Sequence, residues 1–467
     1  MDSDIVVLGG GPAGSMLALR LAQMGHAVTL VERAAFPRAQ VGESLGPAVT
    51  QLFGLVGLRE QIDAARFFRP RTAFVRWENE ETEVKDFGAA PGYQVDRGRF
   101  DQILLGAAAD ADVRVLQPVT ARRPLRRPGG GWVIPLRRDG REFVLTASYC
   151  ADACGRPSLL GGKRARLSPR AIALYAYWTG TDLGGWETRV EAGEAEWYWG
   201  APLPDGTINA AVFLDPRRCA ALSRASIEDF YLSLITRSAL LHVCLNGAIV
   251  GRMKACDATS SAADPLVGED FLRVGDAALT IDPLSSQGVQ TAILTALQAA
   301  AVINTTLRRP ADTAHALEFY RAGQKHRAEQ FQRLSARFYA ARARRTAEEF
   351  WQERAAGAAP ETPESRVEPL PIGTPLRLAA DAKLARCPVL SGDFITLEET
   401  LLHPRLEEPC AFVSGVRLAP LLRQLGDGRS VADLLQGWAS QLAPDTAEGV
   451  LSWLWEAEVI SPVGEAA

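Results

Sequence analysis

The sequence predicts a mixed α/β protein, α+β overall, with an N-terminal unit of alternating strands and helices, an inserted antiparallel sheet and a small C-terminal domain. A β-branched apolar run at 4–8 breaks into glycines, and helical periodicity and a second apolar run at 28–31 follow. Segments between 171 and 213 alternate with a period of two and are rich in aromatic residues. Small residues and prolines at 355–365 interrupt all apolar periodicity before a final helical stretch.

Length and composition are those of a globular protein with two or three domains. The chain has 467 residues, of which 47% are hydrophobic and 7% aromatic. Its formal charge of -4 provides no basic field, so nucleic acid and membranes are not expected partners. We see no signal peptide and no long apolar run, and therefore expect a cytoplasmic protein. The seven cysteines are scattered without metal-ligand spacing, so we expect reduced thiols and no metal.

The first thirty-two residues have the pattern of a Rossmann-like dinucleotide-binding unit. Gly9 permits a tight turn, Gly11 lets the backbone approach a pyrophosphate, and Gly14 lets the helix pack closely on the strand. The helix N-terminus supplies unpaired N–H groups and a positive dipole end. Glu32 ends the second strand where a carboxylate would hold a ribose hydroxyl. Strand, glycines, helix, strand and acid in this order predict dinucleotide binding rather than a purely structural glycine turn.

Two segments after this unit resemble a known family. By pattern alone, residues 36–47 are a loop and a helix start. Residues 95–101 resemble the arginine-bearing turn of single-component flavoprotein monooxygenases and flavin-dependent halogenases, which lies against FAD. The resemblance implies that 36–47 lies beside the isoalloxazine ring and that Arg99 or Arg97 holds phosphate or ribityl oxygens. Asp96 could equally be only a helix N-cap.

Two later segments extend the resemblance and predict FAD as the cofactor. The small-residue turn at 150–158 resembles a family element near the adenine side. The segments 271–278 and 282–289 resemble the Gly-Asp motif, whose aspartate binds the ribityl chain, and the proline loop. That loop leads into a helix whose N-terminal amides face the flavin and stabilise its anionic reduced ring. The cofactor-binding residues implied are Gly9, Gly11, Pro12, Ala13, Gly14, Glu32, Arg33, Arg38, Arg99, Asp152, Gly275, Asp276, Pro283, Gln287, Gly288 and Val289.

Two inserted segments, 71–93 and 167–253, are expected to form the substrate domain. Strands are predicted at 171–178, 196–200 and 207–213, and their aromatic faces suggest a sheet that covers the flavin and lines a substrate chamber. The discontinuous FAD-binding domain is then predicted at 1–70, 94–166 and 254–310.

Two tryptophans, Trp197 and Trp199, fall on one face of the second of these strands. Closure of the core would explain either tryptophan alone. The stretch 197–202 nevertheless resembles the WxWxxP element of flavin-dependent halogenases, which in that group is thought to separate the flavin from the substrate pocket.

The two residues that carry halogenation chemistry in the family are missing. The window 67–77, where the family has its catalytic lysine, contains none, and the nearest is Lys85. Ser285 stands where the family's glutamate would be. These departures favour a monooxygenase over a halogenase, and no general base can be named. The flavin-facing candidates for a catalytic role are Glu43, Pro283, Ser285, Trp197 and Trp199.

The C-terminal part predicts a long helical segment at 311–354, a linker at 355–371 and a small, mainly helical domain at 372–467. This domain resembles the winged-helix modules that bind peptides in ribosomal-peptide modification. A structural cap or a dimer contact would explain it equally. Its expected elements are helices at 418–425, 431–442 and 446–456, caps at Ser430 and Asp445, and a strand from Val459.

The resemblance implies an FAD-dependent oxidoreductase that is reduced by NAD(P)H or by a flavin reductase and hydroxylates an aromatic ring through a C4a-hydroperoxyflavin. With its missing lysine and its C-terminal module, the chain resembles the branch that hydroxylates a tryptophan side chain during tryptophylquinone biogenesis, in the quinohaemoprotein amine dehydrogenase system. The substrate would be a peptide or a small protein subunit. Two alternatives stay open: a halogenase or small-molecule aromatic hydroxylase of secondary metabolism, and a flavin-dependent reductase of isoprenoid lipids.

Overall fold

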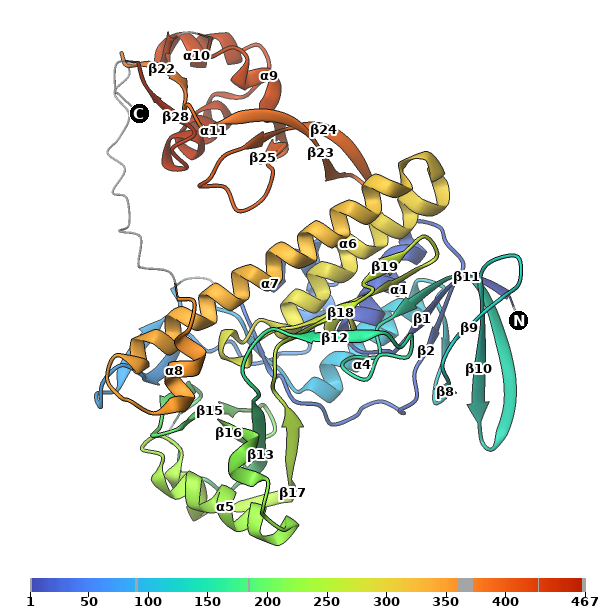
Figure 1. Ribbon diagram of the computed structural model, residues 1–467, viewed down its shortest axis with the longest axis vertical. Helices are drawn as coiled ribbons and strands as arrows, with labels where there is room; N and C mark the ends of the chain where they lie inside the picture. The colour runs from blue at the N-terminus through green and yellow to red at the C-terminus, as the bar shows by residue number, and fades with distance from the viewer. Residues whose placement is uncertain (1, 89–90, 184, 359–372, 427, 464–467) are drawn as a thin grey trace. The chain divides into compact units, whose positions relative to one another are not determined.

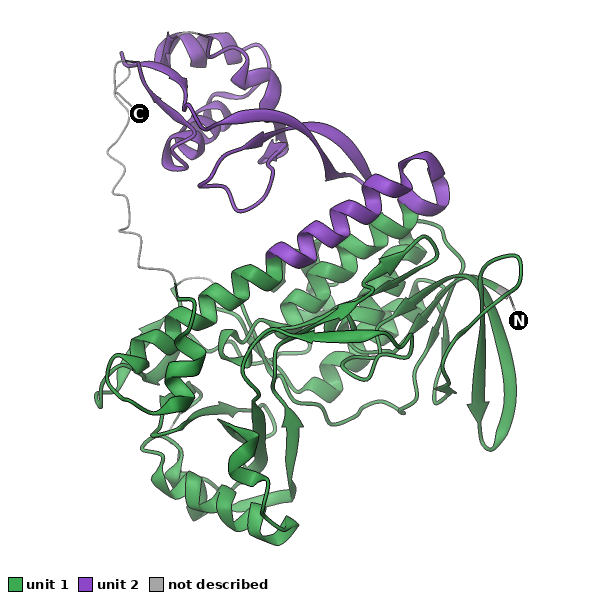
Figure 2. Ribbon diagram, viewed as in Figure 1, with its two compact units in different colours: residues 1–304, 327–359 green, residues 305–326, 360–467 purple. Residues whose placement is uncertain are grey.

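The computed structural model divides the chain into two compact units (Figures 1 and 2). Unit 1 comprises residues 1–304 and 327–359, and unit 2 comprises 305–326 and 360–467. No helix among the described residues is long and apolar enough to cross a membrane. The described residues are 2–88, 91–183, 185–358, 373–426 and 428–463.

A mostly parallel sheet forms the centre of unit 1. Strand β1 (Asp2–Leu8) lies between two parallel neighbours, β2 (Val28–Val31) and β11 (Arg141–Asp152). Helix α1 (Pro12–Gln23) connects β1 to β2, so the predicted βαβ unit is confirmed. The sheet continues through β7 (Arg114–Leu116) at one end and β20 (Phe271–Arg273) and β19 (Val267–Gly268) at the other, and β8 (Thr120–Ala121), β9 (Leu125–Arg126) and β10 (Trp132–Arg138) extend it with antiparallel pairs.

Two glycines allow α1 to leave the sheet so abruptly. Gly9 has φ +102°, in the left-handed region that favours glycine. A Cβ on Gly14 would lie 1.9 Å from the carbonyl oxygen of Gly9, so only glycine lets the helix approach the turn this closely.

A seven-stranded sheet makes up the second layer of unit 1, and strands from both predicted inserts pair in it. One of its faces packs on α5 (Arg224–Arg237) through residues such as Leu174, Val212 and Tyr231. The strands predicted at 171–178, 196–200 and 207–213 are confirmed as β13, β15 and β16. In sheet order the strands are β17 (Ala248–Asp257), β13 (Ile172–Thr179), β16 (Ile208–Leu214), β15 (Glu196–Pro202), β14 (Thr188–Ala192), β4 (Thr72–Arg76) and β5 (Glu83–Asp86).

Shorter elements complete the core of unit 1. Asp96 accepts the Arg99 N–H and caps α4 (Arg97–Asp110), as the sequence allows. The remaining elements are β3 (Ser44–Leu45), α2 (Val49–Leu55), α3 (Arg59–Ala64), β6 (Tyr93–Gln94), β12 (Lys163–Arg166), β18 (Ser261–Asp264) and β21 (Leu279–Thr280).

The segment predicted at 311–354 is helical, but it forms two helices rather than one. After α6 (Gly288–Arg308), the chain forms α7 (Thr313–Ala343), a break, and α8 (Glu349–Ala355). The break has a packing cause, because it lets Trp351 bury fully, with its ring centroid 6.0 Å from that of Tyr339. The Trp351 indole N–H also donates to a backbone carbonyl at 2.6 Å.

Unit 2 contains helices α9 (Leu418–Leu422), α10 (Val431–Trp438) and α11 (Pro444–Glu456) on a small sheet. The Ser430 cap is confirmed, but α11 begins after Ala443, so the predicted cap at Asp445 is wrong. The sheet strands are β27 (Arg429–Ser430), β22 (Pro375–Leu378) and β28 (Ile460–Pro462).

The prediction of a mainly helical C-terminal domain is also wrong. The nine-residue strands β23 (Lys383–Ser391) and β24 (Phe394–Leu402) form a hairpin, and β25 (Phe412–Val413) and β26 (Val416–Arg417) form another. Pro388 lies within β23 although proline has no N–H to donate to a strand ladder. Most of the linker predicted at 355–371 lies outside the described residues.

Candidate active site

The glycine turn, α1 and Arg38 form a cradle for a phosphate group. No side chain caps the first N–H groups of α1, where Gly11 is the N-cap, so they are available to an anion. The Arg38 Nη2 atom lies 3.4 Å from a Cβ built on Gly11. The Arg38 Nε atom is buried and has no hydrogen-bond partner within the described residues. An unpaired guanidinium N–H beside a helix N-terminus fits a phosphate.

Glu32 stands at the end of β2, where the sequence predicts the ribose-binding acid. Its carboxylate accepts the Gly10 N–H and the Ala34 N–H, each at 2.7 Å. Each oxygen keeps a further lone pair, so Glu32 can support the glycine turn and still accept a ribose hydroxyl. The neighbouring Arg33 is exposed.

The two candidate arginines of α4 point in different directions. Arg97 is buried, pairs with Asp101 at 2.9 Å and donates to the Val41 carbonyl at 2.7 Å. Arg99, which the sequence analysis lists as a cofactor ligand, is exposed and lies over the Phe67 ring at 5.6 Å. This placement favours Arg97 as the inward-facing residue.

The carboxylate of Asp152 is committed to its own turn. Its oxygens accept the Cys154 N–H at 3.0 Å, the Ser158 hydroxyl at 2.7 Å and the Leu160 N–H at 2.9 Å. Asp152 thus shapes the turn predicted near the adenine side, and it can act on a ligand through the backbone conformation that it holds.

The Gly-Asp motif is brought against the N-terminus of α1. A Cβ on Gly275 would lie 2.7 Å from the Ala13 Cβ, so the two turns touch. Asp276 presents an exposed side chain at this junction. Although part of the Asp276 side chain reaches solvent, the protein packed around its carboxylate raises its pKa, and nearby arginines, Arg156 and Arg164 among them, partly offset that rise. A carboxylate at this position fits the hydroxyls of a ribityl chain.

The proline loop is held by its own first residue. Asp282 accepts the Leu284 N–H at 3.0 Å, and Pro283–Ser285 form a single 3-10 turn. The Ser285 hydroxyl donates to the Asp282 carbonyl at 3.1 Å, so it serves the loop. Gln287 and Val289 are half-buried and Gly288 is exposed at the start of α6, where the first amides of a helix lack partners within the helix.

Glu43 is a buried acid close to the start of α6, with 1% of its surface exposed. One carboxylate oxygen accepts the Tyr177 hydroxyl at 2.7 Å and the Asn209 amide at 3.1 Å, and the other accepts the Gly42 N–H at 2.8 Å. Burial raises the pKa of Glu43, and the Tyr177, Gly42 and Asn209 donors and the Arg97 charge lower it in part.

The flavin-facing candidates Trp197 and Trp199 are both packed away, 2% and 8% exposed. Trp197 stacks on Phe213 with ring centroids 3.8 Å apart and an interplanar angle of 7°. The aromatic cluster that they belong to also contains Trp77, Tyr339, Phe350 and Trp351, and lies on the sheet face opposite α5. This cluster packs on the sheet face that carries Tyr177 and Asn209.

The family model for tryptophan halogenases matches residues 4–91 and 81–372. The chain belongs to the tryptophan halogenase family. It is an FAD-dependent oxidoreductase, and the Arg38 Nε atom, which has no partner within the described residues, the α1 N-terminus and the adjoining Asp276 fit FAD.

Curated relatives carry halogenase names. Tryptophan 2-halogenase from Chondromyces crocatus is 32% identical over 338 residues, which are 68% of this chain and 64% of that protein. Flavin-dependent halogenase armH2 from Armillaria mellea is 29% identical over 68% of this chain and 69% of its own length. The match to the first of these thus spans less than two thirds of the relative. These names support the halogenase alternative better than tryptophan hydroxylation.

Solved structures resemble the whole chain. CmlS, a flavin-dependent halogenase, has a TM-score of 0.82 at 21% identity and covers 99% of this chain and 96% of its own, which establishes the mixed α/β halogenase fold. The peptidyl tryptophan dihydroxylase QhpG, essential for tryptophylquinone cofactor biogenesis, has a TM-score of 0.76 at 28% identity. That similarity covers 98% of this chain and 99% of QhpG.

The family's catalytic amine has no substitute in this chain's 67–77 window. Within this window, Arg69 is the side chain closest in chemistry to a lysine. It is exposed, donates to the Pro91 carbonyl at 3.0 Å and lies 4.6 Å from the Tyr93 ring centroid. Lys85 is on the exposed strand β5 and pairs with Glu83. Neither cation lies in the aromatic cluster.

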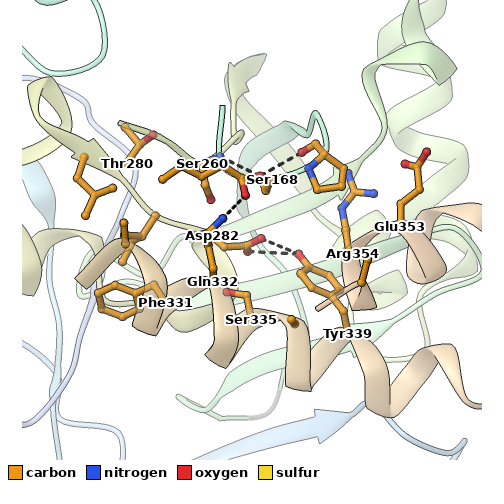
Figure 3. Close-up of a pocket in the computed structure, with 17 residues that line it drawn as sticks. Ser168, Ser260, Thr280, Asp282, Phe331, Gln332, Ser335, Tyr339, Glu353 and Arg354 are labelled. Atoms are coloured by element: carbon orange, nitrogen blue, oxygen red, sulfur yellow. Dashed lines mark hydrogen bonds between the residues drawn. The ribbon is translucent and has the colours of Figure 1, made fainter. Parts of the chain in front are cut away.

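A pocket of about 90 Å³ opens behind the proline loop (Figure 3). Asp282 and Tyr339 meet at its wall, and Arg354 of α8 lines another side. The Ser335 hydroxyl is buried at this pocket without a hydrogen-bond partner within the described residues. Polar and apolar side chains both line the pocket, with Asp282, Ser335 and Arg354 among the polar ones and Phe331 among the apolar ones.

The partners of Glu43 and of Asp282 come from distant parts of the chain and are not among the predicted site residues. Tyr177 and Asn209 lie on β13 and β16, and alternation along those strands could have placed them on one face with Phe213. No local pattern linked Tyr339 to Asp282.

Proposed function

We propose that this FAD enzyme transfers oxygen directly to an aromatic ring, and that its substrate is a tryptophan side chain in a peptide or small protein. The observation that carries the proposal is the absence of both residues that the family uses for halogenation. Ser285 stands where the family has its glutamate. The basic residues in the window 67–77 are all arginines, of which Arg69 lies over the Tyr93 ring. Direct oxygen transfer needs neither residue.

The similarity to QhpG supports the substrate class. QhpG is 28% identical to this chain, whereas the halogenase CmlS is 21% identical, and each structure covers nearly the whole chain, so the higher identity and not the coverage supports a tryptophan substrate. In unit 2, α9, β27, α10, α11 and β28 follow one another in the order that a winged helix would have, after the β23–β24 and β25–β26 hairpins. A module of this kind would hold a peptide, while unit 1 carries the cofactor site.

In this proposal FAD, once reduced, supplies an electrophilic oxygen atom from O2. The electron donor is NAD(P)H or a separate flavin reductase. Arg38 and the first amides of α1 bind the pyrophosphate, and Asp276 orients the ribityl chain. The aromatic cluster around Trp197 keeps water from the reacting face, and the N-terminal amides of α6, which begins at Gly288, would face the ring.

Halogenation is the second candidate, because the curated relatives are halogenases. One experiment separates the two. The FAD-loaded enzyme, an electron donor and a tryptophan-containing peptide are incubated under oxygen-18-labelled O2, with and without chloride or bromide. We expect one or more labelled oxygen atoms in the product by mass spectrometry, and no change with halide. A product that carries halogen and requires halide would reverse the order of the two candidates.

A further inference from the structure

We infer that the Tyr177 oxygen is the acceptor for the ring N–H of the aromatic substrate, and that Glu43 holds Tyr177 in this role. The site would then select indole-type substrates with a free ring N–H over N-alkylated ones. This inference rests on the proposed function for its substrate class and deepens it.

The hydrogen bonds around Glu43 determine the direction of the Tyr177 proton. Gly42 and Asn209 offer N–H groups to Glu43, and those groups can only donate. The oxygen that takes the Asn209 amide also takes the Tyr177 hydroxyl at 2.7 Å. If Glu43 carries a proton on the oxygen that faces Gly42, the bonds from Tyr177 and Asn209 to its other oxygen remain. Tyr177 thus uses its single proton on Glu43, and its lone pairs remain for another donor.

Tyr177 is more exposed than the two side chains that surround it, Glu43 and Asn209. Glu43 is 1% exposed and Asn209 is fully buried, whereas Tyr177 is half-buried. The acid is therefore out of reach of a substrate, and Tyr177 is the member of the group that a ligand can touch.

Tyr177 also lies on the face where the cofactor elements meet. Leu284 of the proline loop, Val41 and Tyr177 all pack against the aromatic cluster. A Cβ built on Gly42 would lie 3.7 Å from a Val289 methyl group, so the Glu43 loop adjoins the first turn of α6. The acceptor is thus next to the loop proposed to face the flavin ring.

The surroundings of Tyr177 and Glu43 preserve the hydrogen bond between them. Burial and the neighbouring Glu43 raise the pKa of Tyr177, so its hydroxyl stays protonated at neutral pH. Arg97 is the cation that faces Glu43, and Tyr175 is the other titratable neighbour on β13. Because the Tyr177 hydroxyl donates to the buried Glu43, its oxygen can accept a hydrogen bond from a ligand at neutral pH.

Equilibrium binding tests the inference without turnover. Indole and 1-methylindole are titrated into the FAD-loaded protein by isothermal calorimetry. We expect indole to bind about five- to tenfold more tightly, the value of one neutral hydrogen bond. In Tyr177→Phe this preference should fall to about one- to twofold, with the flavin absorption unchanged. Tyr175→Phe is the matched control, because Tyr175 lies on the same strand face without bonding Glu43, and it should keep the preference.

Glu43→Gln provides a second variant in case Tyr177→Phe loses FAD. Its amide can rotate to donate to Tyr177, so the preference should decrease. Equal binding of indole and 1-methylindole to the wild type, no binding of indole, or a full preference in Tyr177→Phe would overturn the inference. Such a result would leave the oxygen-18 outcome untouched, and absence of labelled product would leave the binding preference untouched, so the two failures are distinguishable.

Discussion

The Tyr339 hydroxyl donates to both carboxylate oxygens of Asp282, at 3.2 and 3.1 Å. This contact ties α7 to the first residue of the proline loop, whose next residues carry the predicted flavin contacts. Asp282 also caps the loop through the Leu284 N–H, so a single acid links helix position and loop conformation.

Tyr339→Phe should destabilise the protein by about 1–3 kcal/mol at neutral pH, because a half-buried carboxylate loses its side-chain donor. Burial raises the pKa of Asp282 in the folded protein above its ordinary value. Protonation of Asp282 therefore stabilises the folded state at pH values below the ordinary pKa, and this stabilisation is lost as pH rises through the pKa of the folded state. Loss of the donor raises the folded pKa further. The difference between variant and wild type should therefore shrink as pH falls.

Denaturant unfolding followed by flavin fluorescence at several pH values measures this difference. Asp282→Asn in the Tyr339→Phe background should remove most of the pH dependence. A penalty that is the same at every pH would show that the hydroxyl acts only by filling space.

Gly11→Val should abolish FAD binding, because a side chain here would push against the Arg38 guanidinium, 3.4 Å from a built Cβ, and occupy the phosphate cradle. The purified variant should lack the visible absorption bands of oxidised flavin. Gly106→Ala on α4 is the control: its Cβ would meet nothing within 4 Å, and the variant should remain yellow. A yellow Gly11→Val protein would contradict the proposed cradle.

Arg38→Ala should weaken FAD binding by about ten- to a hundredfold, the value of a charge-assisted hydrogen bond. Arg99→Ala should change it by less than about twofold, since Arg99 is exposed and lies over Phe67. Titration of apoprotein with FAD, followed by flavin fluorescence quenching, gives both dissociation constants. The reverse order would restore Arg99 as the phosphate ligand.

Removal of residues 373–467 tests unit 2. The Ile395 N–H donates to the Thr305 hydroxyl at 2.8 Å, and Arg309 lies 3.6 Å from the Phe394 ring centroid, so these helix residues lose partners on deletion. We expect lower thermal stability but retained FAD, because every predicted cofactor residue is in unit 1. Hydroxylation of a peptide should fall more than that of free tryptophan. Equal losses would indicate a purely structural unit 2.

The sequence by itself determined features that depend on neighbours along the chain. The βαβ unit follows from a buried apolar run and a glycine turn, and the caps at Asp96 and Ser430 follow from residues three positions apart. Local chemistry is enough for these, because the interacting groups are already adjacent.

Only the tertiary structure decided which side chains meet. Glu43 joins Tyr177 and Asn209 from 134 and 166 residues away, and no local pattern specifies such a pairing. The break between α7 and α8 likewise depends on the burial of Trp351, which outweighs continued helical propensity. Arg97 rather than Arg99 faces inward because Asp101 and the Val41 carbonyl receive it, and those partners exist only once the loop and helix have packed.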